Sequence, residues 1–297
     1  MSFTADDWVR HPTFGDGVIL EDRGDKYVVR FVSSGERTLL KTAITLAGSS
    51  PHPGFQFPKV RASGSLRFKT ERRPRREVFT FDRLIAGFRN VFAGGFDGAH
   101  FDSLERQYKV VAADLLCELC GQQRVQALLD GENYNEVCRR ALRVVRATNL
   151  VFPQEQIQLA DGLATTGNRK LFSEQLCSLL YSDSSEEARF DGFVEMLGCI
   201  KALTWTTATY FQFLHTRGRW MFMKPVVTQR MADSLNIALN YRSEPNWLTY
   251  CKLQELAQVL ERELRIRGLN PGSGIDLQGF IWTSIRIADG NYGGDPS

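Results

Sequence analysis

Residues 8–40 read WVRHPTFGDGVILEDRGDKYVVRFVSSGERTLL, and this stretch decides the fold of the N-terminal part of the chain. Apolar runs at 18–20, 27–31 and 38–40 alternate with turn-forming segments rich in Gly, Asp and Ser. Such runs of Val, Ile, Tyr and Phe predict short antiparallel strands. Gly15 and Gly17 are expected to bracket the first strand. A unit this small needs barrel closure or a partner surface to be stable.

A sequence pattern within this stretch identifies a possible family. It consists of His11-Pro12-x-Phe14-Gly15-x-Gly17-Val18, a strand ending at Phe31, and then Gly35 and Leu39. The pattern resembles the small Tudor/SH3-like barrel at the C-terminus of UvrD-type DNA helicases, and the related barrel of CarD-type transcription regulators. In those families the barrel is a docking module implicated in contact with RNA polymerase. The resemblance covers roughly an eighth of the 297 residues, and the chain has no G-x-x-x-x-G-K-[ST] loop of a helicase motor.

The resemblance implies that the barrel docks on transcription or repair machinery, or on a nucleic-acid duplex. Small barrels bind through an exposed edge strand or a groove. We name His11, Phe14 and Arg30 as the candidate partner-binding residues. His11 and Phe14, like Phe31, also suit a structural role as barrel-core and turn residues, which is the commoner case, and both interpretations stay open.

Residues 47–77 are rich in Pro, Gly and Ser, which predicts a linker. Between Lys59 and Arg76, eight basic residues accompany one acid, Glu71, a local charge of +7 (8 − 1) in a chain of net charge +3. Basic clusters of this kind neutralise phosphates. The predicted nucleic-acid-binding residues are Arg61, Arg67, Lys69, Arg72, Arg73, Arg75 and Arg76.

From Thr80, a candidate N-cap, the apolar spacing becomes helical. Helices are predicted over residues 81–92, 101–119, 123–129, 133–147, 154–164, 169–181, 184–200, 228–239, 245–267 and 275–286. Ser184 with Glu187 is a candidate capping box, and Thr228 and Ser243 are candidate N-caps of the helices that follow them. Segment 203–227 instead favours β-structure at 204–209 and 211–213. The predicted fold class is mainly α with a small all-β N-terminal module: a Tudor/SH3-like barrel at 1–46, a linker at 47–77 and an irregular helical domain at 78–297.

The helical part resembles a bacterial family of uncharacterised proteins. The resemblance is carried by Lys224-Pro225-x-Val227-Thr228, Pro245-Asn246-Trp247-x-Thr249-Tyr250 and Asp276-x-Gln278-x-Phe280-Ile281-Trp282. It implies that residues 78–290 form one unit, and it implies no activity.

Composition indicates an ordinary soluble protein, with 43% hydrophobic and 24% charged residues. The N-terminus has no signal-peptide pattern, and no apolar run is long enough to span a membrane. Six cysteines without a disulfide spacing predict free thiols and a cytoplasmic location. No metal site and no cofactor is predicted.

Three further motifs have two interpretations each. Cys117 and Cys120 are three apart on a predicted helix, where core thiols are favoured over a metal or redox pair. The segment 270–275 is similar to the hairpin of helix-hairpin-helix units, but an ordinary helix–helix turn is favoured, because Asn270 stands where that motif has an apolar residue. Arg217, Arg219, Trp220 and Lys224 follow a run of aromatic residues, which suits either stacking on bases or a core with surface cations.

The leading functional hypothesis is a non-enzymatic, nucleic-acid-associated interaction protein. Its barrel docks on a partner or duplex, and its basic linker contacts phosphates. The alternative is a nucleic-acid-processing enzyme with an unrecognised site in the helical domain, for which no catalytic residue can be named. A pure protein–protein adaptor is a third class, and salt-dependent DNA binding separates it from the first.

Overall fold

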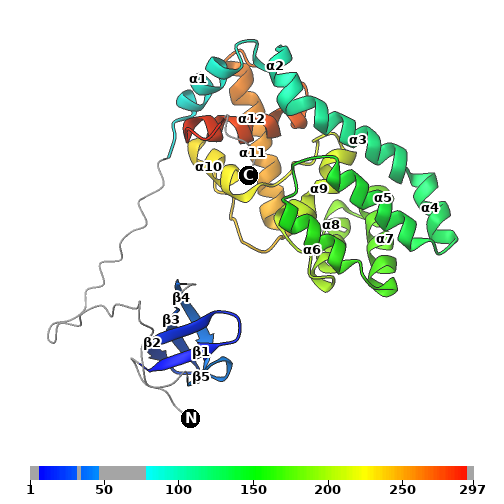
Figure 1. Ribbon diagram of the computed structural model, residues 1–297. Helices are drawn as coiled ribbons and strands as arrows, with labels where there is room; N and C mark the ends of the chain where they lie inside the picture. The colour runs from blue at the N-terminus through cyan, green and yellow to red at the C-terminus, as the bar shows by residue number, and fades with distance from the viewer. Residues whose placement is uncertain (1–6, 32–34, 47–77, 293–297) are drawn as a thin grey trace. The chain divides into compact units, whose positions relative to one another are not determined.

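A computed structural model describes residues 7–31, 35–46 and 78–292. The chain divides into two compact units, Met1–Arg72 and Arg73–Ser297 (Figure 1). The domain boundaries predicted after residues 46 and 77 adjoin residues outside the described ranges, so they stay predictions. Each unit is treated by itself.

The N-terminal unit is a small curled antiparallel sheet, a half-barrel. Its strands are β1 (Trp8–His11), β2 (Gly15–Arg23), β3 (Lys26–Phe31), β4 (Gly35–Leu40) and β5 (Thr45–Leu46), in the order β4-β3-β2-β1-β5. Because side chains alternate along a strand, Tyr27, Val29 and Phe31 share one buried face. They form a core with Val9, Ile19 and Ile44.

The half-barrel confirms the expected β module, but one detail of the prediction is wrong. Gly15 and Gly17 do not bracket a strand, since both lie inside β2, opposite His11 and Val9 of β1. The strands β1 and β5 were also not predicted, because β1 is short and polar at its end and β5 has only two residues.

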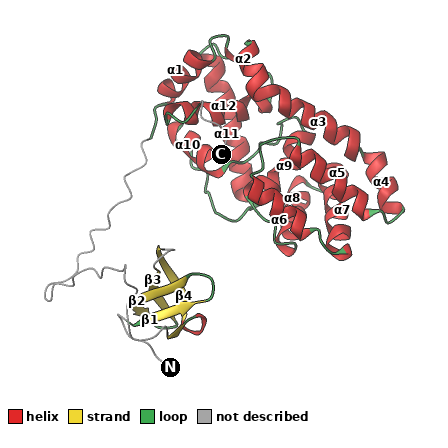
Figure 2. Ribbon diagram, in the orientation of Figure 1, coloured by secondary structure: helices red, strands yellow, loops and turns green. Residues whose placement is uncertain are grey.

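In the second unit, the regular secondary structure of the described residues is all helical, and loops join the helices (Figure 2). Its helices are α1 (Phe81–Val91), α2 (Ala99–Phe101), α3 (Gln107–Cys120), α4 (Gln122–Asp130), α5 (Tyr134–Arg146), α6 (Pro153–Gly162), α7 (Thr166–Tyr181), α8 (Glu186–Cys199), α9 (Trp205–His215), α10 (Pro225–Ser234), α11 (Trp247–Ile266) and α12 (Gly274–Ala288). A short 3-10 turn, η2 (Gly95–Asp97), precedes α2, and a π-helical turn, η3 (Asp102–Arg106), joins α2 to α3. The predicted fold class, mainly α with a small all-β module, is confirmed.

Local capping explains where several of these helices begin. The Thr80 side chain accepts the backbone N–H of Arg83, as predicted for the start of α1. Elsewhere the caps differ from the predicted ones: Ser185 rather than Ser184 caps α8, and Asn246 rather than Ser243 caps α11. Helix α10 begins at Pro225, three residues before the predicted cap at Thr228, because proline suits the first helical position.

The β-structure expected at 204–213 is wrong, since these residues belong to helix α9. Thr204 caps the helix together with Thr207, and residues 205–214 are all buried. A helix buried on every side has no polar face and therefore no helical period in its sequence. The β-propensity of its Thr and aromatic residues is then overridden by tertiary packing.

Helix α12 is buried in the same way along most of its length. It packs against α1, α10, α11 and the π-helical turn, of which α1 and the π-helical turn are distant in sequence. The helix α12 is labelled among these elements in Figure 1. The buried ion pairs of Glu105 with Lys109 and of Arg106 with Asp276, described below, lie in this part of the domain.

Candidate functional site

The predicted partner residues His11 and Phe14 shape the turn between β1 and β2. His11 Nδ1 accepts the backbone N–H of Thr13 at 3.1 Å and that of Phe14 at 3.3 Å. The His11 ring stacks on Phe14 with a centroid distance of 4.6 Å, and Phe14 lies 5.5 Å from the buried Phe31. Both residues are half-buried and so serve the turn and the core edge. Partner binding by them stays a prediction.

The third predicted partner residue, Arg30, lies in β3 opposite Val18 and Glu36. Its side chain is not among those that the structure describes. The seven predicted nucleic-acid-binding residues also lie outside the described residues: Arg61, Arg67, Lys69, Arg72, Arg73, Arg75 and Arg76. Nothing in the geometry therefore tests these positions.

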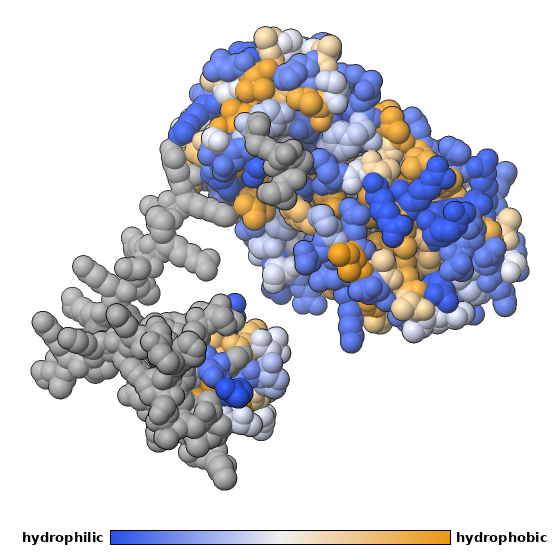
Figure 3. All heavy atoms as spheres, viewed as in Figure 1, coloured by the Kyte–Doolittle hydropathy of each residue, from blue (hydrophilic) through white to orange (hydrophobic). Residues whose placement is uncertain are grey.

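The described residues contain a basic surface that was not predicted, on helix α5. Arg139, Arg143 and Arg146 occur at i, i+4 and i+7, and all three are exposed; we call them the α5 arginine face. Strongly hydrophilic residues gather over α5 in Figure 3. Arg139 pairs with Glu136 at 2.6 Å, whereas Arg143 and Arg146 have no acidic partner in the described part of the chain. Four arginines and one glutamate give α5 a net charge of +3 (4 − 1).

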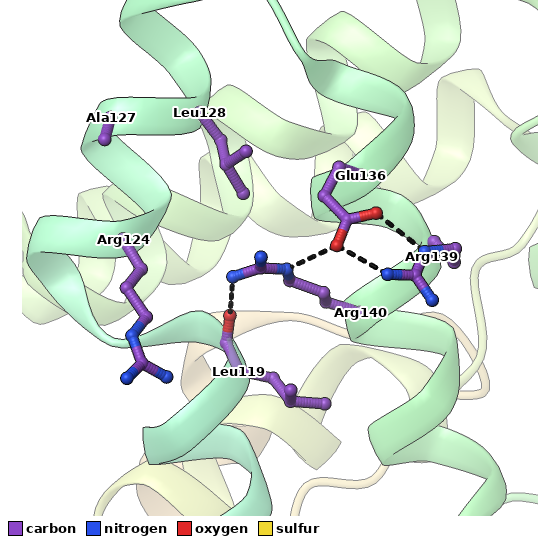
Figure 4. A pocket seen from close by; sticks show the side chains of 7 residues that line it. All are labelled: Leu119, Arg124, Ala127, Leu128, Glu136, Arg139 and Arg140. Atoms are coloured by element: carbon purple, nitrogen blue, oxygen red, sulfur yellow. Dashed lines mark hydrogen bonds and ion pairs between the residues drawn. The ribbon is translucent and has the colours of Figure 1, made fainter.

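A shallow pocket of about 420 Å³ adjoins this face, between α4, α5 and the end of α3 (Figure 4). Glu136 accepts hydrogen bonds from Arg139 and Arg140, and Arg140 also donates to the Leu119 carbonyl at 3.0 Å (Figure 4). The two guanidinium groups lower the pKa of Glu136 to about 2. Arg124 lines the pocket and donates to the Glu118 carbonyl. Three cations and one anion thus surround an open pocket, an arrangement that favours anions.

A buried ionic network lies where the π-helical turn packs against α12. Lys109 is fully enclosed, and its Nζ lies 3.1 Å from Oε2 of the buried Glu105. Burial raises the pKa of Glu105 and lowers that of Lys109, and each shift is opposed by the partner's charge. Helix α2 and the π-turn both approach α12 closely, since a Cβ on Gly279 would lie 2.8 Å from Cζ of Phe101 in α2 and 3.4 Å from Cβ of Glu105 in the π-turn. π-turns inside helices are often found at functional sites.

A second ion pair anchors the start of α12. Arg106 Nε donates to Asp276 Oδ1 at 2.7 Å, and Asp276 Oδ2 accepts the Gly272 N–H at 2.7 Å. Asp276 is almost fully buried, so this pair joins the π-turn to the turn before α12. This ion pair therefore has a structural role.

For the hairpin-like segment 270–275, the structure supports the interpretation as an ordinary turn. Gly272 N–H is bound by Asp276, Ile275 N–H by Ser273, and a Cβ on Gly274 would lie 1.9 Å from the Gly218 carbonyl oxygen. The segment 270–275 is thus an ordinary packed turn. Two of its backbone donors, Gly272 and Ile275, are engaged within the protein.

The cysteine motif is split between interior and surface. Cys120 is buried, and burial raises its pKa to about 12, whereas Cys117 is exposed. The core interpretation is therefore right for Cys120 and wrong for Cys117. Among the described residues, no three His, Cys, Asp or Glu side chains gather as a metal site would require.

The aromatic run at 210–222 belongs to the core. Arg217 and Arg219 reach outward to Asp114 and Glu186, at 2.6 and 3.5 Å. Lys224 differs from both, because it has no acidic partner within the described ranges and lies between two aromatic rings. We return to this residue below.

Comparisons with protein-family models, with curated proteins and with solved structures find no match to this chain. In the described ranges, no helix has the length and apolar character needed to cross a membrane. The functional argument therefore depends on the geometry of the residues themselves.

The sequence analysis missed the α5 arginine face although its signal is visible. In EVCRRALRVVR, four arginines follow a single acid, and three of them recur at helical spacing. A helix was predicted there from apolar residues, and the complementary charged face was not examined. The surroundings of Lys224 had no such signal, because they come from three separate segments.

Proposed function

We propose that the protein is a nucleic-acid-associated interaction protein whose helical domain contacts phosphates through the α5 arginine face. The observation that carries the proposal is the pair Arg143 and Arg146, exposed and without an acidic partner among the described residues. Unpaired guanidinium groups are free to bind phosphate oxygens in bidentate geometry. Arg139 extends the same face.

The spacing of the face supports a nucleic-acid strand as the ligand. Seven residues of helix at 1.5 Å each separate the first and last arginine, so the face spans roughly 10 Å. One strand of duplex carries a phosphate about every 3.4 Å along the axis. The face therefore matches about three consecutive phosphates. The basic segment 59–76, with its charge of +7, would add contacts in the same chain.

The half-barrel is proposed as the docking element of the same protein. Its two edge strands are β4 and β5, and edge strands of small sheets are ready to pair with a partner segment. The likeness to the Tudor/SH3-like barrels of UvrD-type helicases and CarD-type regulators suggests a partner in transcription or repair. His11, Phe14 and Arg30 remain its candidate contacts.

A matched pair of double variants of the full chain tests the α5 arginine face. Arg143→Ala with Arg146→Ala should weaken binding to a 30-base-pair duplex roughly tenfold or more, because two charge-assisted contacts are lost. Arg242→Ala with Arg262→Ala removes the same charge from exposed positions elsewhere. Fluorescence anisotropy at low salt should separate the two. If both double variants weakened duplex binding equally, the α5 arginine face would not be a specific phosphate-binding surface.

A further inference from the structure

The pocket between α4, α5 and the end of α3 combines cationic groups with apolar side chains. It has a volume of about 420 Å³, and its lining residues are Leu119, Arg124, Ala127, Leu128, Glu136, Arg139 and Arg140. In Figure 4 the guanidinium groups of Arg124 and Arg140 point towards the same space, with Leu119 and Leu128 beside it. One ligand can therefore meet positive charge and apolar surface at this place.

The three arginines of the pocket keep nitrogen donors that no described residue uses. Arg139 donates through Nε and Nη2 to Glu136, which leaves Nη1. Arg140 donates through Nε to Glu136 and through Nη1 to a backbone carbonyl, which leaves Nη2. Arg124 uses only Nη1, also for a backbone carbonyl. These bonds orient the guanidinium groups and still leave N–H groups for an anion.

The charge of the pocket matches a phosphomonoester better than a phosphodiester. Three guanidinium groups and one carboxylate give the lining a net charge of +2 (3 − 1). A phosphodiester carries one negative charge, whereas a phosphomonoester carries about −1.5 to −2 at pH 7 and presents three acceptor oxygens. A nucleic-acid strand has phosphodiesters along its length, and a phosphomonoester belongs to its end. The charge balance therefore favours a strand end over a strand interior.

The pocket is continuous with the α5 arginine face. Arg139 belongs to both, and the direction from Arg146 to Arg139 leads towards the first turn of α5, where Glu136 lines the pocket. A strand whose phosphates follow the face in this direction reaches the pocket with its last phosphate. The base of a terminal nucleotide has one face without a stacked neighbour, and the apolar lining residues can cover part of it.

We propose that this pocket binds the terminal phosphomonoester of a nucleic-acid strand, with Arg124, Arg139 and Arg140 as the phosphate contacts. The three apolar lining residues contact the sugar and base of the terminal nucleotide. This inference rests on the proposed function, because the α5 arginine face brings the strand to the pocket. The protein then prefers phosphorylated strand ends to hydroxyl ends.

Competition between short duplexes that differ only in their ends tests the proposal on the full-length protein. Unlabelled duplexes with 5′-phosphate, 3′-phosphate or hydroxyl ends displace an internally labelled duplex, followed by fluorescence anisotropy. We expect one phosphorylated end to raise the affinity about tenfold over the hydroxyl end, because charge-assisted hydrogen bonds are gained. The gain should become smaller from pH 7.5 to pH 5.5, since the second ionisation of a phosphomonoester lies at about pH 6.

Three variants assign the preference to the pocket. Arg124→Gln should reduce the preference to about twofold or less, because Arg124 lines the pocket and is not part of the α5 arginine face. Arg242→Gln removes the same charge from an exposed position elsewhere and should keep the full preference. Arg143→Ala with Arg146→Ala should weaken phosphorylated and hydroxyl-ended duplexes by the same factor.

The outcomes separate this inference from the proposed function. Equal affinity for phosphate and hydroxyl ends would overturn the inference, and the proposed function would still stand if the Arg143 and Arg146 double variant weakened duplex binding. A preference that Arg124→Gln left intact would overturn the assignment to this pocket. Adenosine 5′-monophosphate that competed as strongly as the phosphorylated duplex would assign the pocket to free nucleotides and overturn its role at strand ends. Absence of binding to every duplex would overturn both proposals.

Discussion

Lys109 and Glu105 form an ion pair that the surrounding helices enclose almost completely. Replacing Lys109 by Met leaves the Glu105 carboxylate buried without its partner. We expect the free energy of unfolding to fall by about 3–5 kcal/mol, as measured by urea denaturation at pH 7. Lys170→Met is the control, since Lys170 and Glu174 are exposed and 3.9 Å apart, and its effect should be below about 1 kcal/mol.

The same variant should show a diagnostic pH dependence. Burial raises the pKa of Glu105 in the folded state, and without Lys109 only the more weakly acting charge of Lys224 still opposes that shift. The unfolded chain then ionises at lower pH than the folded one, so stability declines as pH rises between the two pKa values. The loss in free energy of unfolding caused by Lys109→Met should therefore become smaller as the pH is lowered from 8 to 5. A constant deficit would mean that Glu105 does not remain buried.

The lowered pKa of Lys224 has the opposite effect: at basic pH it makes stability rise as the pH increases. Its pKa is lowered to about 8 in the folded state, so the unfolded chain holds more protons above that pH. The stability of wild type minus that of Lys224→Met should rise as pH increases from about 8 to 10.5. Urea denaturation at these pH values measures the difference. If the difference in stability between wild type and Lys224→Met did not change with pH, Lys224 would be solvated like an ordinary surface lysine.

At the scale of residues, the local pattern predicts the cap at Thr80 correctly and three other caps wrongly, and it predicts tertiary environments poorly. Thr80 was predicted as a cap because capping is local, and the Thr80 hydroxyl does accept the Arg83 N–H. Lys224, Trp282 and Phe152 are brought together by α10, α12 and the segment before α6. No spacing along the chain links such residues, so their meeting required the fold.

At the scale of elements, the close packing of α2 and the π-turn on α12 leaves no room for a side chain at Gly279. Ala at this position would place its Cβ 2.8 Å from Phe101 Cζ, so the two elements must separate. We expect Gly279→Ala to lower the free energy of unfolding by about 1–3 kcal/mol, although alanine favours helix. Gly167→Ala in α7 is the matched control, because its Cβ would meet nothing within 4 Å.

The control substitution should be neutral or raise stability by up to about 1 kcal/mol. Thermal denaturation of both variants checks the comparison. If Gly279→Ala were as harmless as Gly167→Ala, the close packing of α2 and η3 on α12 would be contradicted.

Elements with an amphipathic period were predictable, and those without one were not. Helices α1 and α5 have one apolar face each and were placed within one or two residues. Helix α9 is buried on all sides, so its sequence has no polar face to reveal the helix. The π-turn at the start of α3 was also invisible, because a π-turn changes the register by a single residue.

At the scale of the whole molecule, the sequence indicated a β module followed by a helical domain, and this order is confirmed. The segment between them is rich in Pro, Gly and basic residues, so its sequence predicts early cleavage by trypsin. Brief digestion should cut first within 47–77 and leave a fragment beginning near residue 78. First cuts within 100–200 would contradict the predicted domain division.

The central claim is that this chain binds nucleic acid through phosphate contacts, and the salt dependence of duplex binding tests it most directly. For the wild-type protein, log affinity should fall linearly with log salt at a slope near −0.9 for each phosphate contact. Arg143→Ala with Arg146→Ala should make that slope shallower by about 1.8, and replacing Arg72, Arg73, Arg75 and Arg76 by Ala should reduce it further. Affinity that is independent of salt in the wild-type protein, or a slope unchanged in both variants, would contradict the account.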